Sequence, residues 1–262
     1  MKTATLITGA SSGIGLELAK IFAANRHNLI LVARNEESLR QLKKQLKEQH
    51  HIQVAVIVKD LSEPGIPEDI YRTTKEQNWN VDVLVNNAGF GLAGYFYETD
   101  LQTEIDMITV NVSAVVQLTK LFLKDMLERG NGKILNVGST ASFVPGPGLA
   151  VYYATKAFIL SFSQAVGYEV KKRGVTVSTL CPGPTATNFS RRTNNHRSWA
   201  FNNGLLRLMS AEKVARISFK QFMQGKSLIV PGVMNKLSVF FPRLMPRKLL
   251  LFFIHFINKD RS

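Results

Sequence analysis

The 262-residue sequence contains a single cysteine, Cys181. One cysteine cannot form a disulfide within the chain, which excludes a fold held together by internal disulfide bonds. Cys181 lies in the strand-like run VTVSTLCPG, and a cysteine in such a run is typically a small buried apolar residue. We therefore predict that Cys181 belongs to the core, and nothing in the sequence requires a secreted setting.

Long hydrophobic runs are also lacking. The longest one in the C-terminal part, residues 249–257, contains His255 and falls well short of the roughly 20 apolar residues that a membrane-spanning helix needs. Strand-like residues begin at Thr3, so we expect no signal or transit peptide ahead of the fold. The expected location is the cytoplasm, with membrane association through the C-terminal part as an alternative.

Acidic residues are scarce, because the chain has 19 Asp and Glu against 33 Lys and Arg and a net charge of +14. The basic residues are scattered over several segments instead of forming one stripe, which disfavours nucleic acid as a partner. The same positive field would suit an anionic substrate, an acidic carrier protein or an acidic membrane surface. It would also serve solubility alone, so charge does not decide between these functions.

Internal repeats, low-complexity tracts and long linkers are absent as well, so we expect one large domain. The sequence does contain a regular alternation of short aliphatic runs and helical patterns, which is typical of βαβ units around a parallel sheet. The aliphatic runs are nearly continuous in apolar residues, which indicates a sheet covered on both faces. Strands are expected in TATLITG, NLILVA, IQVAVIVKD, VDVLVNNAG, KILNVGS, VTVSTLCPG and SLIVPG.

Helical patterns fill the gaps between these runs. Leu39, Leu42 and Leu46 recur at helical spacing among lysines and glutamines, the pattern of a helix with one face on the sheet and one in water. The predicted fold class is α/β, a doubly wound, Rossmann-type sheet of about seven parallel strands with helices on both faces, with its ligand beyond the carboxyl ends of the strands. Helices are expected near residues 14–24, 36–49, 68–77, 111–127 and 211–224, and from residue 151 onward.

A glycine-rich turn follows the first strand. TGASSGIG, residues 8–15, has glycines at 9, 13 and 15, and a helical pattern begins at Ile14. Glycines permit a tight turn and let backbone N–H groups and the helix N-terminus approach a pyrophosphate. The spacing differs from G-x-G-x-x-G, so plain turn chemistry is the alternative for this motif taken alone.

The stretch VYYATKAF, residues 151–158, pairs a tyrosine with a lysine. In a helix, Tyr152 and Lys156 lie one turn apart on the same side, while Tyr153 points about 100° away. A phenol beside an ammonium group can serve as a proton donor, because the positive charge lowers the tyrosine pKa from about 10. The alternative is that Tyr152 and Lys156 form an ordinary i,i+4 pair on the helix surface. Tyr153 is predicted to be a packing or subunit-contact residue.

Together these motifs resemble the classical short-chain dehydrogenase/reductase family, which has T-G-x-x-x-G-x-G at the first strand-to-helix turn. The resemblance covers residues 3–232. Each matching residue also has an ordinary structural interpretation, such as a helix N-cap for Asn111 or a loop serine for Ser139, but the set in this order is specific. The further matches are Asp60, NNAG at residues 86–89, Asn111, Ser139, Tyr152 with Lys156, PG at residues 182–183, and Thr187.

The resemblance implies four catalytic residues, Asn111, Ser139, Tyr152 and Lys156, and no metal. Tyr152 would exchange a proton with the substrate oxygen while a nicotinamide exchanges a hydride with the carbon. Lys156 would lower the pKa of the phenol and bind the nicotinamide ribose, and Ser139 would donate a hydrogen bond to the oxygen. Asn111 resembles the asparagine that links the lysine to a proton-relaying water.

The end of the second predicted strand bears on the cofactor. A carboxylate there would hold the ribose 2′-hydroxyl of NAD, whereas an arginine accommodates the 2′-phosphate of NADP. The chain has Ala33 and Arg34, so NADP(H) is favoured over NAD(H), with a merely solvated Arg34 as the alternative. The expected cofactor-binding residues are Gly9, Ser11, Ser12, Gly13, Ile14, Gly15, Arg34, Asp60, Leu61, Asn87, Ala88, Gly89, Tyr152, Lys156, Pro182, Gly183 and Thr187.

Substrate identity is expected to depend on three loop segments, residues 90–93, 142–151 and 185–209. The apolar and basic residues that they supply suit an apolar substrate, including one with an anionic end or a carrier. These residues are Phe143, Val144, Leu149, Trp199, Phe201 and Leu205, with Arg191, Arg192 and Arg197 nearby.

The predicted function is therefore that of an NADP(H)-dependent oxidoreductase that interconverts a ketone or aldehyde and an alcohol on an apolar substrate, with acyl-type substrates as one option. Residues 1–232 would form the catalytic domain of a homodimer or homotetramer. Residues 233–262, where apolar runs alternate with prolines and basic residues, would pack on this domain, on a partner subunit or on a membrane surface. The alternatives are a catalytically silent nucleotide sensor and a peripheral membrane protein recruited by these last residues.

Overall fold

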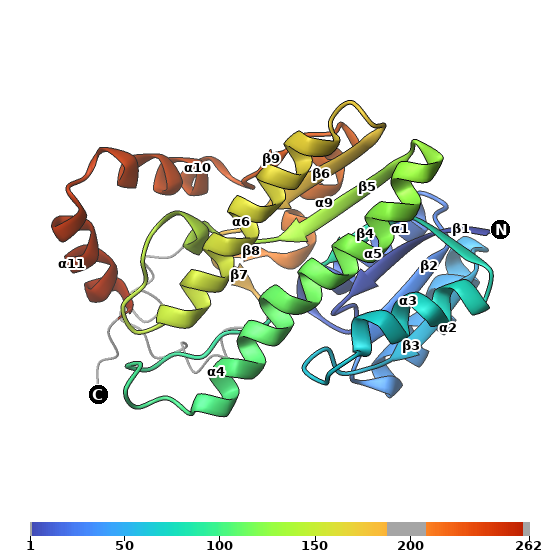
Figure 1. The fold of residues 1–262 in the computed structure, drawn as a ribbon, viewed down its shortest axis with the longest axis horizontal. Helices are drawn as coiled ribbons and strands as arrows, with labels where there is room; N and C mark the ends of the chain where they lie inside the picture. Colours follow the sequence, from blue (N-terminus) through green and yellow to red (C-terminus); the bar gives the residue numbers. More distant parts are fainter. Residues whose placement is uncertain (1, 188–207, 259–262) are drawn as a thin grey trace.

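The computed structural model describes residues 2–187 and 208–258, which are built around a seven-stranded parallel sheet (Figure 1). The strand order is β3-β2-β1-β4-β5-β6-β9. The prediction of a doubly wound sheet of about seven parallel strands is confirmed. The strands are β1 (Lys2–Thr8), β2 (Leu29–Ala33), β3 (Val54–Val58), β4 (Trp79–Asn86), β5 (Gly132–Val137), β6 (Val175–Leu180) and β9 (Leu228–Ile229), and β7 (Thr185–Ala186) pairs separately with β8 (Met209–Ser210).

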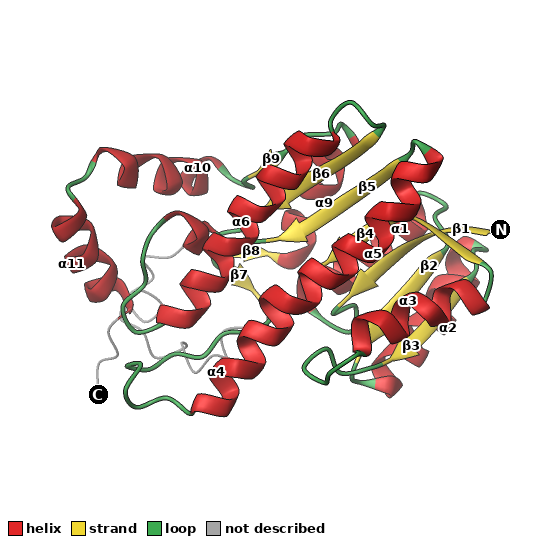
Figure 2. Ribbon diagram, viewed as in Figure 1, coloured by secondary structure: helices red, strands yellow, loops and turns green. Residues whose placement is uncertain are grey.

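Helices cover both faces of the sheet (Figure 2). One face is covered by α1 (Gly13–Ala24), α2 (Glu36–His50) and α9 (Ala211–Met223). The other is covered by α3 (Ile66–Glu76), α5 (Ala114–Arg129) and α6 (Ala150–Val170). Each face therefore has its own apolar core, and the strands between them are buried on both sides.

The residues expected in the core lie there. Leu39, Leu42 and Leu46 form the buried stripe of α2, so the helical spacing in the sequence identified its inner face correctly. Cys181 is fully buried just after β6, and its burial raises the pKa of the thiol to about 12. The prediction that this cysteine is a core residue is confirmed.

The helix expected near residues 111–127 begins earlier than predicted. It starts as α4 (Leu101–Ile108), where the Asp100 side chain accepts a hydrogen bond from the Thr103 backbone at 2.8 Å, continues through a π-helical turn, η1 (Thr109–Ser113), and ends as α5. Among the described residues, this continuous helix, Leu101–Arg129, is the one long and apolar enough to cross a membrane. It packs against α3, β4 and α6, so we interpret it as a core helix.

Three further helical segments follow the last strand of the sheet. They are α10 (Val233–Phe240), η4 (Phe241–Leu244) and α11 (Arg247–Asn258). Figure 1 shows them as an arm that extends beyond the carboxyl ends of the strands. The short helix η2 (Thr140–Phe143), which follows β5, contacts α10.

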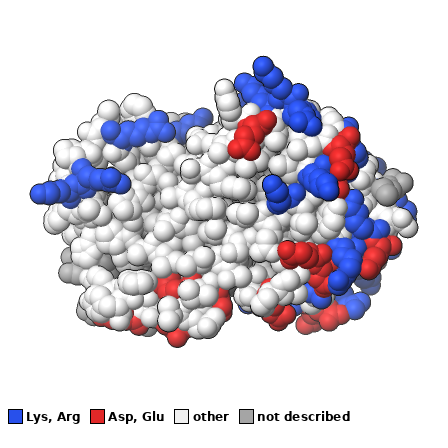
Figure 3. All heavy atoms as spheres, in the orientation of Figure 1, with Lys and Arg blue, Asp and Glu red and all other residues white. Residues whose placement is uncertain are grey.

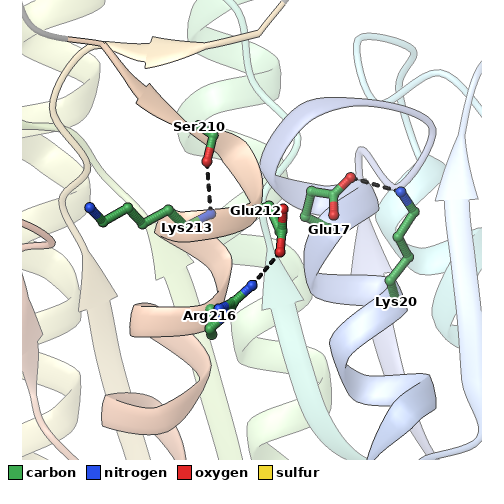
Figure 4. A network of polar contacts seen from close by, with 6 residues as sticks. All are labelled: Glu17, Lys20, Ser210, Glu212, Lys213 and Arg216. Carbon is green, nitrogen blue, oxygen red and sulfur yellow. Dashed lines mark hydrogen bonds and ion pairs between the residues drawn. The ribbon is translucent and has the colours of Figure 1, made fainter.

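Helices α1 and α9 lie side by side on one face of the sheet. Two short-range pairs lie on these helices (Figure 4): Lys20 binds Glu17 at 2.8 Å at a partly buried site, and Arg216 binds Glu212 one turn away at an exposed site. The Ser210 hydroxyl caps α9 by accepting from the backbone of Lys213 at 3.2 Å. Each of these pairs lies within a single helix and does not join the two helices, so the apolar contact between the helices determines their position.

That apolar contact generates a prediction about stability. Phe22 of α1 is fully buried and meets the rings of Phe219 and Phe222 of α9 edge to face, with centroids 5.0 and 6.4 Å away. Replacing Phe22 by Ala should lower the free energy of unfolding by about 3–5 kcal/mol, measured by urea denaturation. Tyr168→Ala, at a site that is 84% exposed, is the control and should change it by less than about 0.5 kcal/mol. Similar losses in both variants would contradict the assignment of this core.

Candidate active site

A cavity of about 990 Å³ lies at the carboxyl ends of the strands, where the sequence predicted a ligand. The strand order reverses between β1 and β4, which is the usual place for a ligand in a doubly wound sheet. Asn111 and Gly15 lie behind the cavity wall. The predicted site residues that line the cavity are Gly9, Ser11, Ser12, Gly13, Ile14, Arg34, Asp60, Leu61, Asn87, Ala88, Gly89, Ser139, Tyr152, Lys156, Pro182, Gly183 and Thr187.

The glycine turn after β1 packs against the segment that follows β4. Gly9 and Gly13 have φ angles of +66° and +58°, a conformation that suits glycine. A Cβ atom on Gly15 would lie 2.4 Å from both the Asn87 side-chain nitrogen and the Gly9 carbonyl oxygen. Gly15 therefore shapes the turn from behind without reaching the cavity.

Thr8, which the sequence analysis did not include among the site residues, joins these two segments. Its hydroxyl oxygen accepts hydrogen bonds from the backbone N–H groups of Asn87 and Ala88, both at 3.0 Å. The Asn87 side chain in turn donates to the carbonyl oxygens of Thr8 and Gly9 at 2.9 and 3.2 Å. Thr8 is the first residue of TGASSGIG, and this position in the motif could have identified it as a site residue.

Arg34 and Asp60 form an ion pair at one end of the cavity. The guanidinium nitrogen lies 3.1 Å from the Asp60 carboxylate, and the Arg34 side chain is 69% exposed. Burial raises the pKa of Asp60, but hydrogen bonds from Ser62 and Arg34 outweigh it and hold the pKa below its usual range. Asp60 is therefore ionised near neutral pH, and the exposed guanidinium can still reach a second anion.

Ser139 and Tyr152 meet at the floor of the cavity. Ser139 is the N-cap of η2, where its hydroxyl accepts from the backbone of Ala141 at 3.1 Å. The Ser142 hydroxyl accepts from the Ser139 backbone at 3.3 Å and donates to the Lys156 carbonyl oxygen at 2.7 Å. The Ser139 side chain also hydrogen-bonds the Tyr152 hydroxyl, so both hydroxyls are fixed next to each other.

The pKa of Tyr152 differs from the sequence expectation. A neighbouring lysine was expected to lower it, but burial raises it well above its ordinary value, and the hydrogen bond from Ser139 only partly opposes this effect. The expectation was wrong, because removing the phenol from water raises its pKa more than the Ser139 hydrogen bond lowers it, and Lys156 is not among the causes of the shift. Tyr152 therefore holds its proton throughout the physiological pH range.

The Lys156 side chain is only 5% exposed. Its ammonium donates to the Val137 carbonyl oxygen at 2.9 Å and lies 5.8 Å from the centre of the Tyr152 ring. Burial lowers the pKa of Lys156 to about 8, and the described residues provide no ion pair for it. The spacing of four residues does place Lys156 beside Tyr152 and not beside a surface partner.

Asn111 lies in the π-helical turn and is almost fully buried. Its amide nitrogen donates to the Phe90 carbonyl oxygen at 2.9 Å and to the Thr155 hydroxyl at 3.1 Å, while its amide oxygen accepts from the Phe90 backbone at 3.1 Å. A Cβ atom on Gly89 would lie 2.8 Å from that oxygen and 3.4 Å from the Lys156 nitrogen. Asn111 is thus a buried residue close to Lys156 that joins the Phe90 backbone to Thr155. It is not a helix N-cap, which was the alternative interpretation.

The other end of the cavity is partly apolar. Phe90, Val144 and Leu149 line it, as the sequence suggested. Phe143 does not, because it faces a separate concavity, so that expectation was wrong. The remaining predicted substrate residues, Arg191, Arg192, Arg197, Trp199, Phe201 and Leu205, lie outside the described residues.

The C-terminal helices supply a wall of the same cavity. Met234, Asn235 and Ser238 line it from α10, and Ile254 and Ile257 line it from α11. This is the position expected for residues 233–262 if they pack on their own domain.

Tyr153 and Asn258 connect α11 to the loop before α6. The Tyr153 hydroxyl lies 3.5 Å from the Asn258 side chain, whose amide donates to the Pro147 carbonyl oxygen at 3.0 Å. A Cβ atom on Gly146 would lie 2.2 Å from the Tyr153 ring. Tyr153 is therefore a packing residue, as its direction on the helix predicted, and it also contributes to the cavity wall.

Comparison with known proteins agrees with this site. A model of the short chain dehydrogenase family matches residues 3–198, so the chain belongs to this family. Among the described residues there is no cluster of three or more side chains that could hold a metal ion.

Two relatives are the very-long-chain 3-oxoacyl-CoA reductase of Anas platyrhynchos and a putative ketoacyl reductase of Streptomyces coelicolor. The first is 38% identical over 192 residues, which cover 71% of this chain and 61% of that protein. The second is 36% identical over 195 residues, which cover 74% of each. The chain thus matches less than two thirds of the length of the first relative.

Two solved structures resemble this one and contain NADPH. A short-chain dehydrogenase from Sphingobium yanoikuyae has a TM-score of 0.82 and 29% identity, with coverage of 94% of this chain and 95% of that one. The actinorhodin polyketide ketoreductase has a TM-score of 0.78 and 29% identity, with coverage of 87% and 95%.

The lowered pKa of Lys156 generates a prediction about pH. Because burial shifts it from 10.5 to about 8, the unfolded chain binds more protons than the folded one between these values, and the contribution of Lys156 to stability rises with pH across that window. Without cofactor, the difference in unfolding free energy between the wild type and Lys156→Met should rise by about 3 kcal/mol from about pH 7.5 to about pH 10.5. Both proteins share the other titrating groups, so the difference isolates Lys156. A difference that stays flat would show that this side chain is not buried as described.

Proposed function

We propose that the protein is an NADP(H)-dependent reductase that interconverts the 3-oxo and 3-hydroxy forms of an apolar acyl thioester. The observation that carries the proposal is the hydrogen-bonded pair of Ser139 and Tyr152 hydroxyls beside buried Lys156. They lie in a cavity with a glycine turn at one end and an apolar wall at the other. The proposal includes a homodimer or homotetramer, which the family resemblance implies, and a location in the cytoplasm.

The residues around the glycine turn fit a dinucleotide. The first turn of α1 contains no acidic residue, and its N-cap, Ser12, makes no side-chain capping bond, so the positive end of the helix is available to a pyrophosphate. Gly9 and Gly13 line the cavity with backbone atoms, and their lack of side chains leaves room for close approach. These residues would hold the phosphates.

Arg34 supports NADP(H) over NAD(H). Its exposed guanidinium borders the cavity, and Ala33 leaves the strand end without a carboxylate that would repel a 2′-phosphate. Asp60, which is ionised, pairs with Arg34 and so offsets part of its charge. The two NADPH complexes among similar structures support the same choice.

The catalytic proton is assigned to Tyr152. When bound, a nicotinamide cofactor supplies or accepts the hydride at the carbonyl carbon. Tyr152, which holds its proton at neutral pH because of burial, can donate it to the carbonyl oxygen as negative charge develops there. The Ser139 hydroxyl can donate a second hydrogen bond to the same oxygen.

Lys156 lowers the free-energy cost of that proton transfer. With a pKa of about 8, its side chain is mostly charged near neutral pH, and its bond to the Val137 carbonyl oxygen fixes the ammonium near the Tyr152 ring. A positive charge at this place stabilises the phenolate that remains after proton transfer. Asn111 positions the Phe90 backbone and Thr155 around it.

An apolar acyl substrate is supported by the cavity wall and by the relatives. Val144, Leu149, Ile254 and Ile257 offer aliphatic surface, and the chain is similar to proteins named 3-oxoacyl-CoA and ketoacyl reductases. Each buried methylene of a substrate contributes about 0.8 kcal/mol. Longer acyl chains should therefore be better substrates until the cavity is filled.

Cofactor choice is tested at Arg34. The Arg34→Ala variant should bind NADPH about tenfold or more weakly, because a charged hydrogen bond to the 2′-phosphate is lost, while the Kd of NADH stays within about twofold. Isothermal titration with each cofactor measures both values. Arg40→Ala removes an exposed arginine of α2 that is paired with Glu36 and lies outside the cavity lining; it should change neither. Equal weakening of NADPH and NADH by Arg34→Ala would contradict the proposed role.

Catalysis is tested at Tyr152. With NADPH and 3-oxoacyl thioesters of increasing chain length, Tyr152→Phe should lower kcat/KM by about 10²- to 10⁴-fold, with the Kd of NADPH nearly unchanged. Nicotinamide absorbance follows the turnover. Tyr153→Phe is the matched control, because it removes only the hydroxyl that faces Asn258, and its loss should be several-fold at most. A wild-type protein that binds NADPH saturably but turns over no thioester, ketone or aldehyde would instead favour a silent nucleotide sensor.

A further inference from the structure

The C-terminal helices expose a large apolar surface on the side away from the cavity. We name this surface the C-terminal face; it consists of exposed apolar residues of α10, η4 and α11. Leu244 and Phe252 are 69% and 65% exposed, and exposed apolar residues that gather in one patch mark an interaction surface. Met234 is also exposed but lines the cavity and is not counted. The face comprises Val233, Leu237, Phe240, Phe241, Leu244, Leu249, Leu251, Phe252, Phe253 and Phe256.

The charges around this face have one sign. From residue 213 to residue 258 the sequence contains no Asp or Glu. Figure 3 shows blue side chains and no red ones over the arm that carries α10 and α11, whereas acidic and basic residues mix on the opposite end of the molecule. The basic residues of the arm and its base are Lys226, Lys236, Arg243, Arg247 and Lys248.

Three of these cations converge on one concavity. Lys226, Lys236 and Arg243 line a hollow of about 300 Å³ together with Val239 and Phe240. None of the three has an ion-pair partner among the described residues. A hollow with unpaired cations and an apolar border matches a phosphate headgroup whose acyl chains lie against neighbouring apolar side chains.

The two sides of the same helices face different environments. Ser238 of α10 and Ile254 of α11 line the active-site cavity, whereas Leu237 and Phe253 are exposed. Helices with an apolar exposed face and flanking basic residues are typical of segments that lie in a membrane interface. An external surface that binds the C-terminal face would therefore lie next to the cavity wall that the same helices form.

We infer that the C-terminal face docks on an anionic phospholipid bilayer, with the hollow formed by Lys226, Lys236 and Arg243 taking a lipid phosphate. A second copy of the chain fits less well, because a twofold contact through this face would bring the same unpaired cations together. The inference does not require the proposed reaction. If both hold, an acyl substrate dissolved in the bilayer would enter a cavity whose wall touches the lipid.

Sedimentation of the full chain with vesicles tests this inference. The wild type should pellet with vesicles of phosphatidylcholine and phosphatidylglycerol, and only weakly with phosphatidylcholine alone. At low ionic strength, the triple variant Lys226→Gln, Lys236→Gln and Arg243→Gln should lose about 100-fold in partition coefficient, since each interfacial charge contributes about 1 kcal/mol. The matched control neutralises Lys44, Lys47 and Lys171, which are exposed elsewhere, and should lose much less.

A second pair of variants tests the apolar contribution. Leu244→Ser with Phe252→Ser should also weaken pelleting, whereas Tyr168→Ser, at an exposed site on α6, should not. Thermal unfolding and turnover of a soluble ketone establish that each variant is folded, and failure of the wild type to turn over any ketone would count against the proposed reaction alone. Absence of wild-type pelleting with anionic vesicles, or equal losses in the triple variant and its lysine control, would overturn the inference. So would a dimer in light scattering that Phe252→Ser disrupts.

Discussion

The Lys156 side chain crosses from α6 to the end of β5, where its ammonium donates to the Val137 carbonyl oxygen. Keeping a cation in a nearly dry position costs free energy, and the lowered pKa of Lys156 is the measure of that cost. The hydrogen bond to the Val137 carbonyl oxygen at the end of β5 offsets part of this cost. The charge of Lys156 favours proton transfer from Tyr152, because a buried phenol gives up its proton readily only beside a cation.

The rest of the site follows from the order of the strands. Because β1 and β4 are neighbours, the glycine turn after one meets Asn87 after the other, and Thr8 ties the two segments together. The same ordering places one end of the cavity between these segments and the Ser139 and Tyr152 hydroxyls beside it. The C-terminal helices then form a wall of the apolar end of the cavity and present their other side outward. One segment therefore contributes both to this cavity and to the surface proposed for lipid.

Much of this could be predicted from the sequence, because strands and glycine turns are local patterns. The seven parallel strands follow from the alternation of aliphatic runs with helical patterns, the burial of Cys181 from its place in a strand-like run, and the direction of Tyr153 from helical periodicity. Other features depend on contacts between distant segments, which spacing alone does not contain. Examples are the early start of the helix at Leu101, the orientation of Phe143 into a separate hollow, and the raised pKa of Tyr152, which reflects burial by the whole fold.

The central claim is that one substrate oxygen is held by two neighbouring hydroxyls. A crystal structure of the protein with NADP⁺ and a 3-hydroxyacyl thioester tests it most directly. The account predicts that the 3-hydroxyl oxygen lies within about 3.2 Å of both the Tyr152 and the Ser139 hydroxyl oxygens, with the acyl chain toward α11. An oxygen bound away from both hydroxyls, or a Tyr152 ring turned from the cofactor, would contradict it.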